Sequence, residues 1–139
     1  MRFIKLSITA LSAALIIFAI AALPQRICFD GGADYVFYCG TSSADCKVVR
    51  ASGNAKLTRL FLSNVCGEGA EFKELDIDKF LSGVGGKIIF SENAAGITNY
   101  YCTADLPYSV AIDGTVINLH IAVCEGVVKV GTPIIFGGY

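Results

Sequence analysis

Thiol and imidazole groups are the side chains of this chain with the most distinctive chemistry. The chain has one histidine, His120, and six cysteines: Cys28, Cys39, Cys46, Cys66, Cys102 and Cys124. A cysteine hydrogen-bonded to a histidine can form an activated thiolate nucleophile. A small thiol-dependent enzyme is therefore one hypothesis, with His120, Cys102 and Cys124 as the catalytic candidates.

Spacing limits which cysteine could pair with His120. His120 and Cys124 fall on one predicted strand and lie four positions apart, which is about 13 Å in an extended chain. They cannot hydrogen-bond within a straight strand, so a cysteine from a neighbouring strand, such as Cys102, would be needed. A surface or half-buried strand histidine is the simpler interpretation of His120, and we favour it.

No other motif fixes a reaction, a cofactor or a metal. The sequence lacks a G-x-S-x-G nucleophile elbow, and its carboxylates are scattered. Gly83-Val84-Gly85-Gly86 ends a predicted helix, whereas a phosphate-binding loop opens one. A structural zinc site usually has close ligand pairs, and C-x-x-C is absent. We expect no cofactor, no metal and a non-catalytic domain in preference to an enzyme.

The even number of cysteines is compatible with disulfides in a small exported domain. Cys39 and Cys46 flank a turn-rich stretch and form the first candidate pair. Cys102 and Cys124, on two predicted neighbouring strands, form the second. Free cysteines also serve as small core residues, so the domain need not contain bridges.

The first 23 residues have the features of a targeting segment. Arg2 and Lys5 precede an uncharged apolar run over residues 6–23. Ala19-Ile20-Ala21 offers a signal-peptidase site, whereas the run is also near the length of a single-pass anchor. The basic residues come before the run, which favours a C-terminal domain outside the cytoplasm. Residues 1–23 are thus a signal peptide or an anchor that contacts the membrane if uncleaved.

The remainder is predicted to be a linker, residues 24–33, followed by one domain, residues 34–139. Removing Arg2 and Lys5 from the 11 cations leaves nine against 12 acids. This balance gives no concentrated basic face, so nucleic acid is not an expected partner.

The patterns within the domain predict an α+β fold. Two strands, 34–39 and 46–50, precede a helix that begins near Ser52 or Asn54 and closes at Gly67. A second helix begins at Asp76 and is stopped by the glycines after it. Strands follow at 87–92, 97–103, 108–112, 115–124, 127–130 and 134–136, with Asp113-Gly114 as the clearest hairpin signal. We expect an antiparallel β-meander with the two helices packed on one face.

Alternation within residues 115–124 separates two faces. Ile117, Leu119, Ile121 and Val123 should face the helices. The other face carries Asn118, His120 and Cys124 and is mixed. It is expected to be partly covered or to bind a small ligand.

Several C-terminal segments resemble a known group. They are Gly86-Lys87-Ile88-Ile89-Phe90-Ser91-Glu92, Gly96-Ile97-Thr98-Asn99-Tyr100-Tyr101, Asn118-Leu119-His120-Ile121-Ala122-Val123 and Val130-Gly131-Thr132-Pro133-Ile134-Ile135-Phe136-Gly137-Gly138. Over roughly the last 55 residues the chain looks like exported proteins of unknown function from Firmicutes, akin to the YwmB group. The resemblance implies an extracytoplasmic α+β domain and brings no catalytic residue.

The leading hypothesis is an envelope protein that acts through contact with an unidentified protein partner outside the cytoplasmic membrane. The thiol-dependent enzyme and the small-ligand binding module remain the alternatives.

Overall fold

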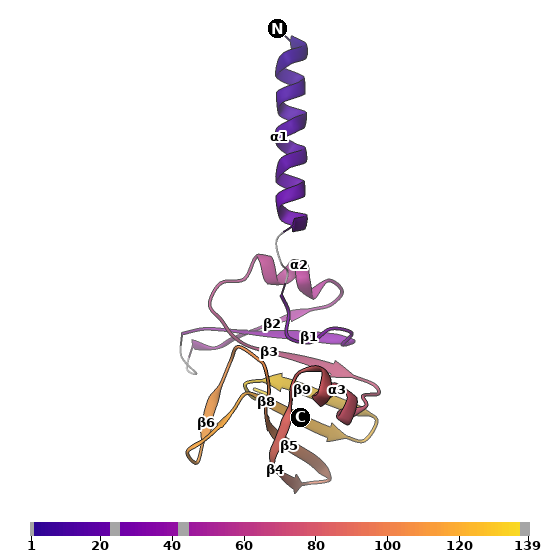
Figure 1. Cartoon of the computed structure of the whole chain (residues 1–139), viewed down its shortest axis with the longest axis vertical. Helices are drawn as coiled ribbons and strands as arrows, with labels where there is room; N and C mark the ends of the chain where they lie inside the picture. Colours follow the sequence, from indigo (N-terminus) through magenta and orange to yellow (C-terminus); the bar gives the residue numbers. More distant parts are fainter. Residues whose placement is uncertain (1, 23–25, 42–44, 137–139) are drawn as a thin grey trace.

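The architecture comes from a computed structural model that describes residues 2–22, 26–41 and 45–136, with the side chains of residues 8–20, 26–41 and 45–136. Helix α1 (Arg2–Ala22) projects away from a compact domain, as Figure 1 shows. Predicted features at residues 23–25, 42–44 and 137–138 lie outside the described residues.

The domain is built on one antiparallel sheet of seven strands, in the order β2-β1-β3-β9-β8-β5-β4. A separate hairpin pairs β6 with β7 around Asp113 and Gly114. The predicted α+β class, with an antiparallel sheet and an N-terminal helix, is confirmed. The strands are β1 (Asp34–Cys39), β2 (Lys47–Ala51), β3 (Val65–Phe72), β4 (Lys87–Ala94), β5 (Ile97–Thr103), β6 (Val110–Ile112), β7 (Thr115–Ile117), β8 (Leu119–Cys124) and β9 (Val127–Thr132).

One face of the sheet carries the main core. Phe37, Leu119, Ile121 and Val130 are almost fully buried there. Helix α3 (Ile77–Gly83) packs on this face through Leu81, because its apolar residues recur at helical spacing. As predicted, Asp76 is the N-cap of α3, and Leu119 and Ile121 belong to this core.

The opposite face is partly covered by the chain after β9. The backbone N–H of Ile135 donates to Nδ1 of His120, at 3.3 Å. Phe136 packs edge-on against Tyr38, with ring centroids 4.9 Å apart. Residues 134–136 form this cover and not the strand predicted for them.

The region after the first hairpin differs most from the sequence prediction. Helix α2 (Ala55–Leu60) has the predicted cap Asn54, but it ends well before Gly67. Leu57 and Phe61, two apolar residues whose helical spacing predicts one shared face, are 46% and 82% exposed. The residues that follow form β3, a central strand that had not been predicted. This strand was not predicted for two reasons. The apolar residues that precede it have helical spacing, and β3 itself is rich in glycine and glutamate, which are depleted in strands.

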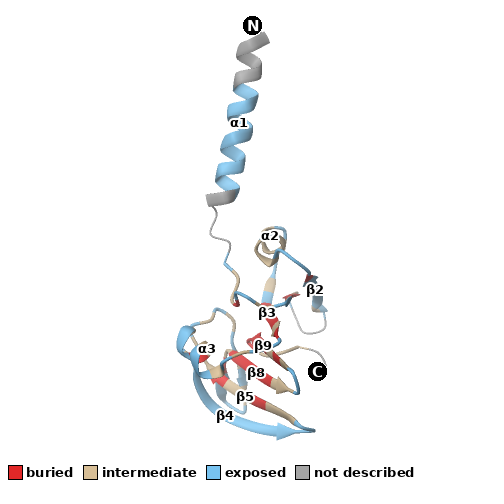
Figure 2. Ribbon diagram, turned by 90° about the vertical axis from the view of Figure 1, so that its right-hand side faces the viewer, coloured by how far each residue is buried: buried red, intermediate tan, exposed pale blue. Residues whose placement is uncertain are grey.

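The predicted linker contributes to the domain core. Phe29 is 1% exposed and its ring lies 6.0 Å from that of Phe80. By contrast, all described side chains of α1, residues 8–20, are exposed, as Figure 2 also shows. Within the described residues, no helix combines the length and the apolar character needed to span a bilayer.

Candidate functional site

Strand β4 is the exposed edge of the large sheet. It pairs with β5 on one side, and no described strand pairs with its other side. All eight of its residues are exposed, including three successive apolar residues, Ile88, Ile89 and Phe90. Figure 1 places β4 at the end of the domain farthest from α1. Unpaired N–H and C=O groups at such an edge can pair with a strand from another chain.

An irregularity in β4 determines which of its residues share a face. The β4–β5 register shifts between Ile88 and Phe90. Lys87 lies opposite Thr103, whereas Glu92 lies opposite Asn99. Because Thr103 and Asn99 are four residues apart on β5, their partners Lys87 and Glu92 lie on the same face.

Three rings form a stack across β4, β5 and β8. Phe90 lies on Tyr101 with ring centroids 4.5 Å apart, and Tyr101 lies on His120 at 4.6 Å. The hydroxyl of Tyr101 donates to Oε1 of Glu92, at 2.7 Å. This stack holds the face of β4 that carries Phe90 against the side chains of β5 and β8.

His120 is buried at the inner end of the stack. Its Nδ1 accepts from the Ile135 backbone, and Nε2 lies 3.0 Å from Oδ1 of Asn99. This arrangement fits a neutral ring that donates from Nε2. Burial lowers the pKa of His120 to about 4, although the nearby carboxylate of Glu92 favours the charged form.

The predicted thiol–imidazole pair is not formed by Cys102. Tyr101 is opposite His120, whereas Cys102 is opposite Leu119. Cys102 and His120 therefore point to opposite faces of the sheet. Cys102 is fully buried, and burial raises the pKa of its thiol to about 11. The four-residue separation of Cys124 from His120 along β8 likewise keeps those two groups apart.

A second group of polar residues surrounds Glu68, which projects from β3 into the core face. Glu68 is 1% exposed. Oε2 accepts from the backbone N–H of Cys28 at 2.8 Å and from the Tyr35 hydroxyl. The hydroxyl of Tyr108 donates to Oε1 at 3.4 Å. Glu68 thus joins the segment before β1 to the centre of the sheet.

Arg59 supplies a cation beside this carboxyl group. Its Nε lies 3.8 Å from Oε1 of Glu68, which is an ion pair but too long for a hydrogen bond. The Nε atom is buried and has no hydrogen-bond partner. Desolvation and the neighbouring Glu68 raise the pKa values of the Cys28 thiol and the Tyr35 hydroxyl well above their ordinary range.

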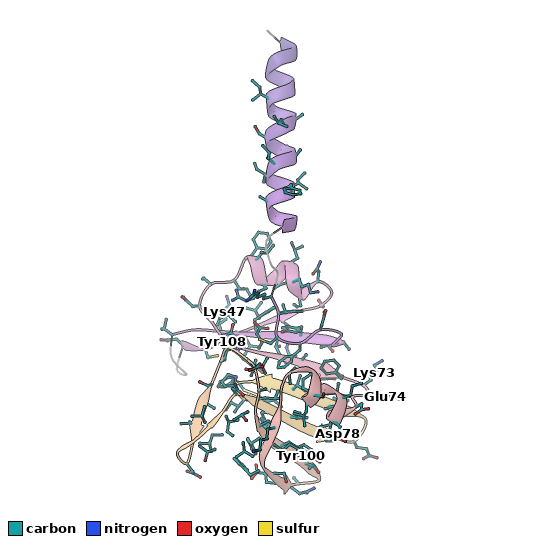
Figure 3. The ribbon with its side chains drawn as sticks, viewed as in Figure 1. Lys47, Lys73, Glu74, Asp78, Tyr100 and Tyr108 are labelled. Carbon is teal, nitrogen blue, oxygen red and sulfur yellow. The ribbon has the colours of Figure 1, made fainter. Side chains whose placement is uncertain are left out.

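A pocket of about 860 Å³ opens beside Arg59 and Glu68. Tyr108, on the segment that leads into β6 (Figure 3), forms part of its wall. Arg26 and Asp105 also line it. The sequence did not predict a site at these residues, since they come from separate elements. The one available signal was a glutamate between two glycines, Gly67-Glu68-Gly69.

Asn118, named with His120 for the ligand-binding alternative, is bonded to the backbone. Its Oδ1 accepts from the N–H of Ala104, and its Nδ2 donates to the Ala104 carbonyl, both at 2.6 Å. A longer bond runs to the Leu106 carbonyl, at 3.4 Å. The amide therefore holds the chain after β5 in place.

The two predicted disulfides are not present, because all six cysteines are free thiols. Thr98 is opposite Val123, so Cys102 lies about five residues, or roughly 16 Å, along β5 from the position facing Cys124. Cys39 lies opposite Lys47, the residue that follows Cys46, but Cys39 and Cys46 do not form a bridge. In the described part of the chain, no cluster of His, Cys, Asp and Glu side chains is arranged to hold a metal ion.

No family model, curated protein or solved structure matches the chain. The resemblance to exported Firmicutes proteins therefore stays a prediction.

Proposed function

We propose that this chain is a non-catalytic interaction module of the cell envelope that self-associates by strand addition at β4. The observation that carries the proposal is an edge strand whose eight residues are all exposed and which contains three consecutive large apolar residues. Its extracytoplasmic location is proposed from the basic and apolar leader.

The partner segment that suits β4 is a second copy of β4. In an antiparallel pair centred between Ile89 and Phe90, Lys87 of each copy lies opposite Glu92 of the other. Opposite charges at directly facing positions stabilise such a pair, and the symmetric arrangement forms two of them. The shared face of Lys87 and Glu92, created by the shift after Ile88, allows the two side chains to meet.

Charge reversal provides the test. The full chain, purified in mild detergent because α1 exposes apolar side chains, should sediment as a dimer. K87E and E92K should each weaken dimerisation about tenfold, because each places like charges opposite each other twice. The K87E/E92K double variant should restore it. K47E, at the other sheet edge in β2, is the matched control and should have no effect.

Two results would overturn this proposal. One is a monomeric wild-type chain over the micromolar range. The other is a dimer that K87E and E92K leave unchanged, which would assign association to another surface such as α1.

A second candidate function is small-ligand binding in the pocket beside Glu68. The buried Nε of Arg59, which has no hydrogen-bond partner, favours it. A cation there suits a ligand with a carboxylate. A panel of small carboxylates and amino acids should include one that raises the melting temperature of wild type but not of R59Q. Equal shifts in both proteins, or none, would remove this candidate.

A further inference from the structure

Three cysteines gather where β1 meets its two neighbouring strands. Cys39, the last residue of β1, lies opposite Lys47 of β2 and opposite Val65 of β3. Cys46 immediately precedes Lys47, and Cys66 immediately follows Val65. The topology therefore brings Cys46 and Cys66 to the same end of β1 from opposite sides.

The contacts place the thiols of Cys46 and Cys66 together. Among the neighbouring side chains, Cys46 has the largest electrostatic effect on the Cys66 thiol. The thiol of Cys66 also donates to the carbonyl of Tyr38, at 3.3 Å, which directs it over β1. On the other side, a Cβ on Gly40 would lie 3.1 Å from Cα of Cys46, so the chain before β2 runs close to β1.

Both residues lie at irregular points of the sheet. Cys46 lies just outside β2, and the β1–β3 register shifts at Tyr38 and Cys39, next to Cys66. Cys66 is exposed and Cys46 is half-buried, whereas Cys102 is buried in the core. Cys46 and Cys66 thus lie at the same end of β1, and both can be reached by a reagent from solvent.

We infer that Cys46 and Cys66 form a reversible disulfide that connects β2 to β3 across β1. The oxidant is a disulfide compound, either a small thiol in its oxidised form or a protein disulfide. The Cys66 thiolate attacks one sulfur of that disulfide, which forms a mixed disulfide and releases one thiolate. The Cys46 thiolate then attacks Cys66 Sγ and displaces the second. Two protons and two electrons leave the cysteine pair, and the oxidant becomes two thiols.

Burial, and next the adjacent Cys46, raise the pKa of the Cys66 thiol. Since the thiolate is the reacting species, the bridge should form faster at pH 9 than at pH 7.

Peptide mapping can identify this bridge without ambiguity. The folded full chain is equilibrated with mixtures of oxidised and reduced glutathione, then alkylated. Trypsin, combined with an endoproteinase that cleaves before aspartate, separates the cysteines of this region. Cys39 falls in peptide 34–44, Cys46 in peptide 45–47 and Cys66 in peptide 60–73. The expected product links peptide 45–47 to peptide 60–73.

Variants strengthen the assignment. C39S should retain the link between 45–47 and 60–73, whereas C46S and C66S should each abolish it. Dominance of a bridge containing Cys39 would overturn the inference. So would a wild-type chain whose Cys46 and Cys66 are both alkylated throughout the glutathione series. Neither result depends on whether β4 forms a dimer, because K87E can be carried through the same mapping.

Discussion

Strands β3 and β4 have the same length but opposite relations between composition and burial. β3 reads Val-Cys-Gly-Glu-Gly-Ala-Glu-Phe and lies in the interior of the sheet, with Glu68 among its most buried residues. β4 reads Lys-Ile-Ile-Phe-Ser-Glu-Asn-Ala and is exposed along its whole length. Figure 2 shows the contrast between the buried residues of β3 and the exposed ribbon of β4.

Position in the sheet, more than hydrophobicity, determines the role of each strand. Glycines in β3 admit close neighbours: a Cβ on Gly67 would lie 2.7 Å from the Thr132 carbonyl oxygen. Its buried glutamate is tolerated because hydrogen bonds and Arg59 compensate the loss of water. β4 keeps its apolar residues at an edge, where they are available to a second chain.

Glu68→Ala should have the largest effect on stability. It would leave the Cys28 N–H, the Tyr35 hydroxyl and the Arg59 cation without their shared acceptor. We expect a loss of about 3–5 kcal/mol in the free energy of unfolding, measured by urea denaturation. Glu71→Ala is the matched control on the same strand. Glu71 is half-exposed, and its Oε2 lies 4.0 Å from Nζ of Lys129. A loss of less than about 1 kcal/mol for the Glu68 variant would mean that the network is not stabilising.

Acidification should have the next largest effect on the free energy of unfolding, through protonation of His120, a buried polar residue of β8. The pKa of His120 is about 4 in the folded chain and about 6.5 when unfolded. The unfolded chain therefore binds more protons between these values, so stability contributed by neutral His120 is complete above pH 6.5 and is lost as pH falls toward 4. The loss should reach roughly 3 kcal/mol at most.

His120→Gln isolates this contribution from the carboxylates that titrate in the same range. The variant should show a smaller fall in unfolding free energy between pH 6.5 and pH 4 than the wild type. Identical pH dependence in the two proteins would show that His120 has the same pKa in both states.

Gly67→Ala should destabilise the domain by about 1–3 kcal/mol, because the new methyl group meets backbone at 2.7 Å. Ser91→Ala in exposed β4 is the comparison, and its effect should stay within about 0.5 kcal/mol. Thermal unfolding of both variants measures the difference. Equal melting temperatures would contradict the tight packing of β3.

Local signals predicted much of this fold. β1, β5, the cap of α3 and the turn at Asp113-Gly114 follow from β propensity, capping and turn chemistry. β3 could not be predicted in this way, since its stability comes from long-range partners on β1 and β9. The Glu68 cluster was missed for the same reason. Its members come from β1, β3, α2 and two connecting segments and meet only in the tertiary fold, whereas the pairing of β5 with β8 separates Cys102 from His120.

Ile89→Thr in β4 should have the smallest effect on the folded monomer. Ile89 is 42% exposed and lies at the register shift, so losing part of its apolar surface should cost less than about 1 kcal/mol. Urea denaturation must be carried out where the chain is monomeric, because strand addition would stabilise wild type at higher concentration. Raising the protein concentration should then widen the difference between the two proteins. A difference above about 2 kcal/mol in the monomer would mean that β4 supports the core, which would weaken its assignment as an interaction edge.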